Sequence, residues 1–182
     1  MEVRKIKVGY LQTNCYILVD EGKCIVIDPG DQFYSIQDQI GNNKLLAVLI
    51  THRHSDHIGA LEHIIKEYHV PVYDRTNLKE GEFNIDNFFF DVLYTPGHTS
   101  DCVTYIFENY NFMFTGDFLF KNSIGRTDLE TGDMDQMKIS LEKIKEYSDR
   151  YRVYPGHGDA TTLGEEKMNN PFLQITDQHE IS

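Results

Sequence analysis

Residues 51–57 read Thr-His-Arg-His-Ser-Asp-His, so three histidines and one aspartate lie within six positions. The segment follows the apolar run LLAVLI (45–50), which is typical of a buried strand. It leads into residues 56–68, where apolar side chains recur at helical spacing. Imidazole and carboxylate groups are good ligands for zinc and neighbouring transition metals. The order of strand, ligand-rich loop and helix therefore predicts a metal site at the end of a buried strand.

The spacing within this loop suggests two ions. In an extended loop His52 and His54 point to the same side and can bind one ion together. Asp56 and His57 lie at the turn into the helix and can reach a second ion beside it. A solvated helix start, capped by Ser55 or Asp56, would explain one or two of these residues but not all of them.

Three further polar residues follow the ends of other predicted strands. His98 in TPGHTS and His157 in YPGHGD each follow Pro-Gly, which forms a tight turn and aims the next side chain. Asp117 in FTGDFLF follows a glycine after an aromatic strand. Each alone could be an ordinary loop residue. Together they supply a third neutral ligand for each ion, and a carboxylate that can bridge two ions about 3.5–4 Å apart.

The remaining pattern predicts a single domain with two sheets covered by outer helices, and not a purely parallel doubly wound sheet. Turns are expected at Thr13-Asn14 and Glu21-Gly22. Strands are expected over 2–10, 14–20, 23–28, 45–50, near 70–73 and over 151–154, and a hairpin-rich stretch is expected over 82–95, 102–107 and 111–115. Helices are expected over 34–41, 56–68, about 134–147 and from near Leu163. In Phe88-Phe89-Phe90 we expect core residues and one solvent-facing ring.

Composition excludes several partners. The net charge of -12 over 182 residues argues against a nucleic-acid footprint. No apolar run approaches the roughly 20 residues of a membrane span, and the N-terminus lacks the pattern of a signal peptide. The three cysteines show no CxxC pair, which favours a reduced cytoplasmic protein with buried thiols. The oligomeric state stays open.

Residues 52–57 match the motif His-x-His-x-Asp-His, and the sequence resembles the metallo-β-lactamase-fold superfamily. The later residues of that family's metal motif are matched by His98, Asp117 and His157. The resemblance implies an α/β fold, a four-layer αββα sandwich with the metals at one edge between the sheets. Asp28 in VIDPG matches an early aspartate that supports the metal loop from behind the ligands in this family.

Within the superfamily, the chain resembles the short form of glyoxalase II, the hydroxyacylglutathione hydrolases. Asp117 stands where the β-lactamase branch usually has cysteine, and His54 stands where flavodiiron proteins have glutamate. The segment Gly-Arg-Thr-Asp (125–128) is shared by the short glyoxalase II-like proteins. Residues 1–182 are then one hydrolase domain that lacks the helical C-terminal domain of full-length glyoxalase II.

The resemblance implies hydrolysis of a small acyl-thiol such as S-D-lactoylglutathione. Two divalent ions, zinc above all and iron or manganese as alternatives, would lower the pKa of a bridging water from 15.7 towards about 7. The hydroxide so formed would attack the thioester carbonyl. Asp56 and Asp117 are expected to act as metal ligands first and in proton transfer second. Arg126 is the candidate contact to a substrate carboxylate, or else it pairs with Asp128 to order its loop; Lys121 and Tyr154 are weaker candidates.

The main rival is a persulfide dioxygenase, which shares the fold, the motif and a similar Gly-Arg-Thr-Asp loop. It binds one non-haem iron, through residues that correspond to His52, His98 and Asp117, and it also retains the residues for the second metal, so the sequence leaves this alternative open. A degenerate, non-enzymatic scaffold would have lost at least one metal ligand, and none is lost here. Three histidines are left out of the site. His63 and His69 lie in or just after the predicted helix, and His179 lies in the tail.

Overall fold

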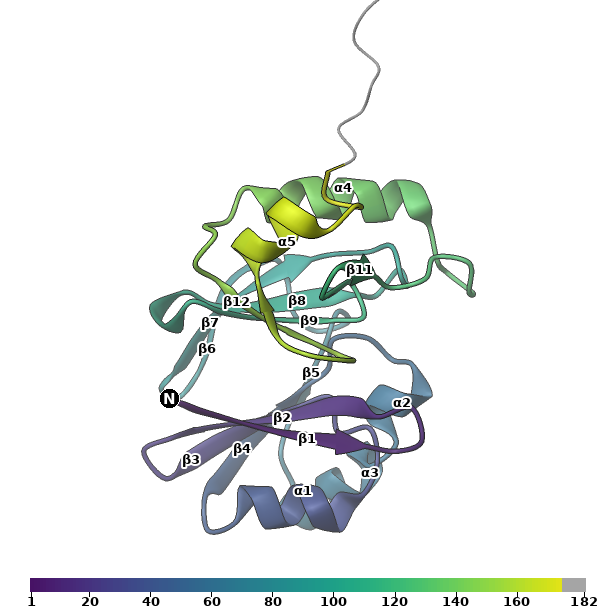
Figure 1. Ribbon diagram of the computed structural model, residues 1–182. Helices are drawn as coiled ribbons and strands as arrows, with labels where there is room; N and C mark the ends of the chain where they lie inside the picture. The colour runs from purple at the N-terminus through teal and green to yellow at the C-terminus, as the bar shows by residue number, and fades with distance from the viewer. Residues whose placement is uncertain (175–182) are drawn as a thin grey trace, which may run out of the picture.

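Two β-sheets face each other in the computed structural model, which describes residues 1–174, and helices cover their outer faces (Figure 1). The first sheet has the strand order β1-β2-β3-β4-β5. Its first two pairings are antiparallel and its last two are parallel. The strands are β1 (Glu2–Val8), β2 (Thr13–Asp20), β3 (Lys23–Ile27), β4 (Lys44–Leu49) and β5 (Val72–Tyr73).

The second sheet has the order β13-β12-β9-β8-β7-β6, and only β12 and β9 pair in parallel. Its strands are β6 (Gly81–Ile85), β7 (Phe88–Tyr94), β8 (Val103–Phe107), β9 (Phe112–Gly116), β12 (Arg152–Pro155) and β13 (Thr161–Thr162). A 3-10 turn, η1 (Glu108–Tyr110), joins β8 to β9. A separate hairpin of β10 (Leu119–Phe120) and β11 (Ser123–Ile124) follows β9.

The helices lie on the outer faces of the two sheets, as Figure 1 shows. On the first sheet, α1 (Phe33–Ile40) and α3 (Leu61–Tyr68) bury Ile36, Ile40 and Ile64 against β2, β3 and β4. On the second, α4 (Met134–Lys145) and α5 (Leu163–Asn169) bury an apolar cluster against β8, β9 and β12. The predicted αββα sandwich is confirmed.

The space between the sheets is filled by an aromatic core. Its largest fully buried side chains include Phe88, Tyr105, Phe107 and Phe114. Phe89, between two buried phenylalanines, is 58% exposed, which confirms the expected single solvent-facing ring. Because rigid packing surrounds the strands on both faces, the loops at their ends are held by a stable scaffold.

Two local predictions are wrong. The turn between the first strands lies at residues 9–12 and not at Thr13-Asn14, because Gly9 takes a left-handed φ of 67° and Thr13 already pairs with Val8 in the sheet. The helix expected over 56–68 is split into α2 (Ser55–Ile58) and α3. Gly59 lies at the break against the Gly30 carbonyl, where a β-carbon would be only 2.2 Å away.

The other elements lie within a few residues of their predicted bounds, although the short strands β10, β11 and β13 and the turn η1 were not predicted. No helix in residues 1–174 is long and apolar enough to cross a membrane. His179, left out of the predicted site, falls outside the described residues.

Candidate metal centre

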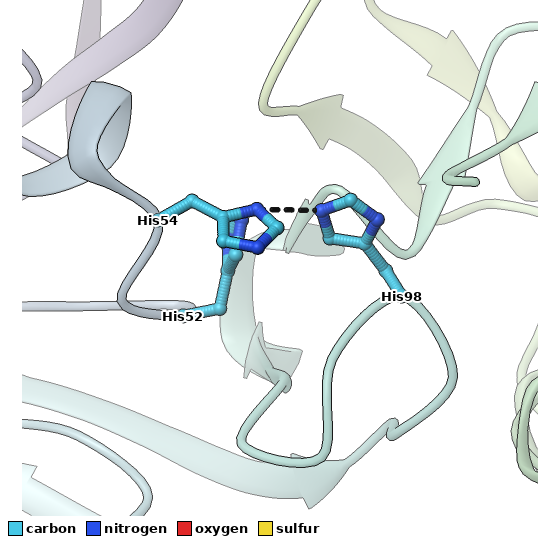
Figure 2. A group of neighbouring side chains, drawn as sticks. All are labelled: His52, His54 and His98. Carbon is cyan, nitrogen blue, oxygen red and sulfur yellow. Dashed lines mark hydrogen bonds between the residues drawn. The ribbon is translucent and has the colours of Figure 1, made fainter. Parts of the chain in front are cut away.

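All seven predicted ligands meet at one edge of the sandwich. His52 follows β4, and His54, Asp56 and His57 lie in and just before α2. The other three follow strands of the second sheet: His98 after β7, Asp117 after β9 and His157 after β12. Figure 2 shows His52 and His54 extending from one loop and His98 from the opposite one, with their rings converging. Each sheet therefore contributes part of the cluster.

The ligand atoms form two groups that are joined by one carboxylate. The nitrogens of His52, His54 and His98 make one group, and donor atoms of Asp56, His57 and His157 make the other, each with its atoms within 4.8 Å of one another. A third group within the same distance, His52, His57 and Asp117, shares one histidine with each of them. In the first group His54 Nδ1 and His98 Nε2 are 3.0 Å apart (Figure 2). Two nitrogens that bind the same tetrahedral zinc at 2.0–2.1 Å would be roughly 3.3 Å apart.

Asp117 lies between the two groups. Its Oδ2 is 3.6 Å from His98 Nε2 and 3.3 Å from His157 Nε2, while its Oδ1 is 3.2 Å from His57 Nε2. One carboxylate is therefore close to ligands of both groups. This is the place where a bridging ligand would reduce the repulsion between two cations.

The donor atoms fit metal ions. His52 Nε2, His57 Nε2 and Asp117 Oδ1 are buried without a hydrogen-bond partner among the described residues. Leaving a buried polar atom without a partner costs about 1–3 kcal/mol, so such atoms require an explanation. Coordination of divalent cations would satisfy all three, and imidazole and carboxylate are suitable donors for such ions.

Hydrogen bonds on the far side of each imidazole fix its orientation. His57 Nδ1 donates to Asp28 Oδ2 at 2.9 Å, and His98 Nδ1 donates to the Arg126 carbonyl at 2.7 Å. His157 Nδ1 donates to the Leu11 carbonyl at 3.1 Å. Since these Nδ1 atoms keep their protons, Nε2 is the nitrogen of each ring that would bind an ion.

Asp28, the residue expected to support the metal loop, lies behind that loop and contacts Thr51 and His57. It is 2% exposed, and besides His57 it accepts hydrogen bonds from the backbone N–H and the hydroxyl of Thr51, at 2.8 and 2.6 Å. It also takes a left-handed φ of 52°, which is uncommon for a residue other than glycine. The carboxylate thus connects the end of β3 to the loop that carries His52.

The sequence did not indicate the groups that hold the rest of the site. The Thr13 hydroxyl donates to Asp56 Oδ2 at 2.8 Å. The buried Asn14 amide donates to the carbonyls of Pro155 and Gly158, both at 2.9 Å, on either side of His157. These contacts join residues more than 40 positions apart, so no local pattern reveals them. At Gly156, a β-carbon would be 2.2 Å from Asp117 Oδ1, which explains the glycine of the Pro-Gly turn.

The carboxylates and burial shift the ligand pKa values in opposite directions. Burial lowers the pKa of His52 well below its usual value, so this ring is neutral at pH 7. Burial also opposes protonation of His57, but the Asp28 and Asp117 carboxylates outweigh it and raise the His57 pKa to about 10. Asp117 and Asp56 likewise raise the pKa of His157 to about 9. Metal ions at these two histidines must therefore displace protons.

An open pocket of about 330 Å³ gives access to the ligands. Leu11 and Leu129 lie on its rim, 57% and 40% exposed, and Arg126 also lines it. The Arg126 guanidinium is exposed and forms two hydrogen bonds to Asp128, at 2.7 and 2.8 Å. The alternative in which this pair orders the loop is therefore present in the structure, and a substrate would have to compete with Asp128 for Arg126.

The remaining candidate residues lie elsewhere. Lys121 lines a neighbouring pocket together with His157 and Asp159. Tyr154 stacks on Phe114, with ring centroids 5.0 Å apart, and belongs to the packing between the sheets. His63 and His69 are exposed and do not belong to the groups of possible ligands.

The chain belongs to the metallo-beta-lactamase superfamily, whose sequence profile matches residues 8–77 and 73–157. It is 33% identical to the probable metallo-hydrolase YqgX of Bacillus subtilis, over 95% of this chain and 98% of that one. It is 31% identical to the hydroxyacylglutathione hydrolase GloC of Haemophilus influenzae, over 95% and 98% of the two chains. These relatives support a metallo-hydrolase of the glyoxalase II-like branch.

Three solved structures are similar to this chain over nearly its whole length. The structure of BLEG-1, described as a B3 metallo-beta-lactamase, matches with a TM-score of 0.92 at 32% identity, over 95% of this chain and all of that one. The structure of TTHA1623 in a di-iron-bound form matches with a TM-score of 0.87 at 31% identity, over 93% of this chain and all of that one. The structure of ETHE1 from Myxococcus xanthus matches with a TM-score of 0.88 at 28% identity, over all of this chain and 92% of that one. The metal ions of the family therefore include iron, and its members differ in the activity that their names state.

Proposed function

We propose that the protein is a dinuclear metal-dependent thioester hydrolase of the glyoxalase II type, which converts a small acyl-thiol into a hydroxy acid and a free thiol. The observation that carries this proposal is the position of Asp117 between two groups of three ligands, with its Oδ1 buried and unpartnered. The rival single-iron site would use only His52, His98 and Asp117, so the number of metal ions bound per chain separates the two reactions. The hydroxyacylglutathione hydrolase GloC among the relatives supports the choice of substrate class.

Two divalent ions, proposed to be zinc, would supply a water-derived nucleophile at neutral pH and polarise the substrate carbonyl. His52, His54 and His98 would hold one ion, Asp56, His57 and His157 the other, and Asp117 would contact both. Burial opposes ionisation of Asp56, but the hydrogen bond from His157 and the charge of His57 outweigh it and hold the Asp56 pKa below its usual value, so Asp56 is suited to stay an ionised ligand.

The pocket rim supports binding of a substrate with apolar and anionic parts. Leu11 and Leu129 present exposed side chains beside the ligands, where they can cover an acyl group. Arg126 is placed to exchange its partner Asp128 for a substrate carboxylate, because a guanidinium binds either one through two hydrogen bonds. The acyl-thiol would then lie across the metal centre between these groups.

The test uses metal-free protein, restored with zinc or with iron under separate conditions. Zinc should restore hydrolysis of S-D-lactoylglutathione, and the Asp117→Asn variant should lose it together with one or both metals. Asp159→Asn is the matched control, because Asp159 lines the neighbouring pocket and belongs to none of the ligand groups; this variant should stay active. Full activity without metal would refute the proposal.

Two further substrates separate the rival reactions. Oxygen uptake on glutathione persulfide by a protein with one iron per chain would favour the dioxygenase. Cleavage of a chromogenic cephalosporin, faster than that of any thioester, would favour a lactamase.

A further inference from the structure

A carboxylate outside the metal centre is completely buried. Glu166, in α5, is 0% exposed, and no lysine or arginine of residues 1–174 pairs with it. Its carboxylate accepts hydrogen bonds from the Asn122 backbone N–H at 2.7 Å, the Thr161 hydroxyl at 2.7 Å and the Asn170 side-chain amide at 2.8 Å. Buried polar groups are normally held by hydrogen bonds, and three donors from separate segments around one buried carboxyl group indicate a specific structural task.

Asn170, just after α5, is also completely buried. Its amide contacts the carbonyl of Ser123 at 3.0 Å in addition to Glu166. Glu166 and Asn170 therefore hold the tip of the β10–β11 hairpin from two sides. Asn122, at this tip, takes a left-handed φ of 59°, and its N–H is the one that Glu166 accepts.

The hairpin connects two parts of the metal centre. It begins two residues after Asp117 and ends two residues before Arg126. The Arg126 carbonyl accepts the hydrogen bond that orients His98. At its base the two arms lie against each other, since a β-carbon on Gly125 would be 1.8 Å from the Asp117 carbonyl and 3.1 Å from His98 Cβ. A shift of the hairpin would therefore move both Asp117 and the acceptor of the His98 proton.

The same carboxylate reaches the loop that carries His157. Thr161 begins β13, at the end of the loop that follows β12 and contains His157. The hairpin also contacts this loop directly, because the Phe120 ring packs edge-on against the His157 ring, with centroids 6.0 Å apart. Glu166 thus joins the hairpin and the His157 loop through one side chain.

We infer that Glu166 and Asn170 form a positioning clasp, which holds the β10–β11 hairpin and the His157 loop so that His98 and His157 each face their own ligand group and Asp117 lies between the two groups. Neither residue touches the ligands, so both act through the backbone that they bind. The inference rests on the proposed function only in assigning metal ions to the ligand groups, and it adds α5 to the parts of the chain that determine metal affinity.

Glu166→Gln tests the clasp with a side chain of the same shape. The carboxylate accepts three donors, whereas a glutamine has one acceptor oxygen and turns an NH2 group towards another donor. We expect zinc affinity of the folded protein to fall several-fold, which is less than the roughly 10- to 100-fold loss typical of groups bonded directly to a metal ligand, because Glu166 acts through the backbone. The measurement is competition with a chromogenic chelator.

Glu165→Gln is the matched control. Glu165 is the next residue, is exposed and belongs to the capping box of α5 with Thr162. It also accepts from the Thr161 hydroxyl at 3.1 Å, but it accepts no hydrogen bond from the hairpin, so the comparison isolates the hairpin contact of Glu166. Loss of helix stability alone would lower the melting temperature of both variants without changing the zinc affinity of the folded protein. The positioning role predicts a loss of affinity in Glu166→Gln only.

Asn170→Ala provides a second measurement, because it removes the contact to Ser123 and leaves two donors on Glu166. It should weaken zinc binding in the same direction. Wild-type zinc affinity in either folded variant would overturn the inference. The readout needs no substrate, so a protein that hydrolyses no thioester would refute the proposed function while the clasp is still tested by zinc affinity.

Discussion

Replacing Asp28 by asparagine changes the charge behind the metal loop with almost no change in volume. Asp28 Oδ1 accepts from the Thr51 N–H, and Oδ2 accepts from both the Thr51 hydroxyl and His57 Nδ1. An asparagine that keeps its oxygen on the Thr51 N–H must turn its NH2 group towards His57. The Thr51 hydroxyl can rotate and accept, but His57 Nδ1 can accept only when its proton moves to Nε2.

That move affects the atom that faces the metal centre. His57 Nε2 is buried without a hydrogen-bond partner, and a proton there blocks it as a ligand. Loss of groups that orient metal ligands typically costs about 10- to 100-fold in metal affinity. This corresponds to about 1.4–2.8 kcal/mol of binding free energy at 1.4 kcal/mol for each factor of ten.

The assay is zinc competition with a chelator of known affinity, on protein shown to be folded by circular dichroism. Asp38→Asn, which removes an exposed carboxylate from α1, is the control and should bind zinc as the wild type does. Binding of both ions to Asp28→Asn with wild-type affinity would refute the assignment of the His57 tautomer to Asp28.

Three further outcomes are expected. The pKa values of His57 and His157, about 10 and 9, exceed the ordinary 6.5, so the metal-free protein should lose stability between pH 6.5 and 10. Zinc should therefore raise the melting temperature more at pH 9 than at pH 6, and an equal rise would contradict this. Burial raises the pKa of all three cysteine thiols, so none should react with a thiol reagent at pH 8 until the protein is unfolded; rapid labelling of the native protein would count against it. Leu11→Ala should raise KM for an apolar acyl-thioester about fivefold with little change in kcat, since about 1 kcal/mol of apolar contact is lost. Tyr10→Ala changes the neighbouring residue, which does not line the pocket beside the metal ligands, and should leave KM unchanged. Equal effects of the two substitutions on KM would exclude a role for the leucine.

The sequence predicted the positions of the candidate ligands because they lie in loops that follow strands with a strong local pattern, or in the short helix directly after such a loop. LLAVLI before His52 and the Pro-Gly pairs before His98 and His157 are recognisable within a few residues. Once two sheets pack face to face, the ends of these strands meet at one edge. The fold and the family could therefore be predicted from short segments.

Other features depend on contacts between distant residues and could not be predicted in this way. Asn14 binds carbonyls more than 140 positions away, and Glu166 binds Asn122 across 44 positions. Strands β10 and β13 have two residues each, too few for an alternating pattern to appear. The break between α2 and α3 follows from the approach of Gly59 to Gly30, which only the packed structure shows.

The central claim, a centre of two metal ions joined by Asp117, is tested most directly by titration of the metal-free protein with zinc while thioester hydrolysis is measured. The arrangement of two ligand groups around one carboxylate predicts that activity rises until two equivalents per chain are bound and then stays constant. In the Asp117→Asn variant this endpoint should be lost. Activity that is complete at one equivalent, or present before any metal is added, would contradict the account.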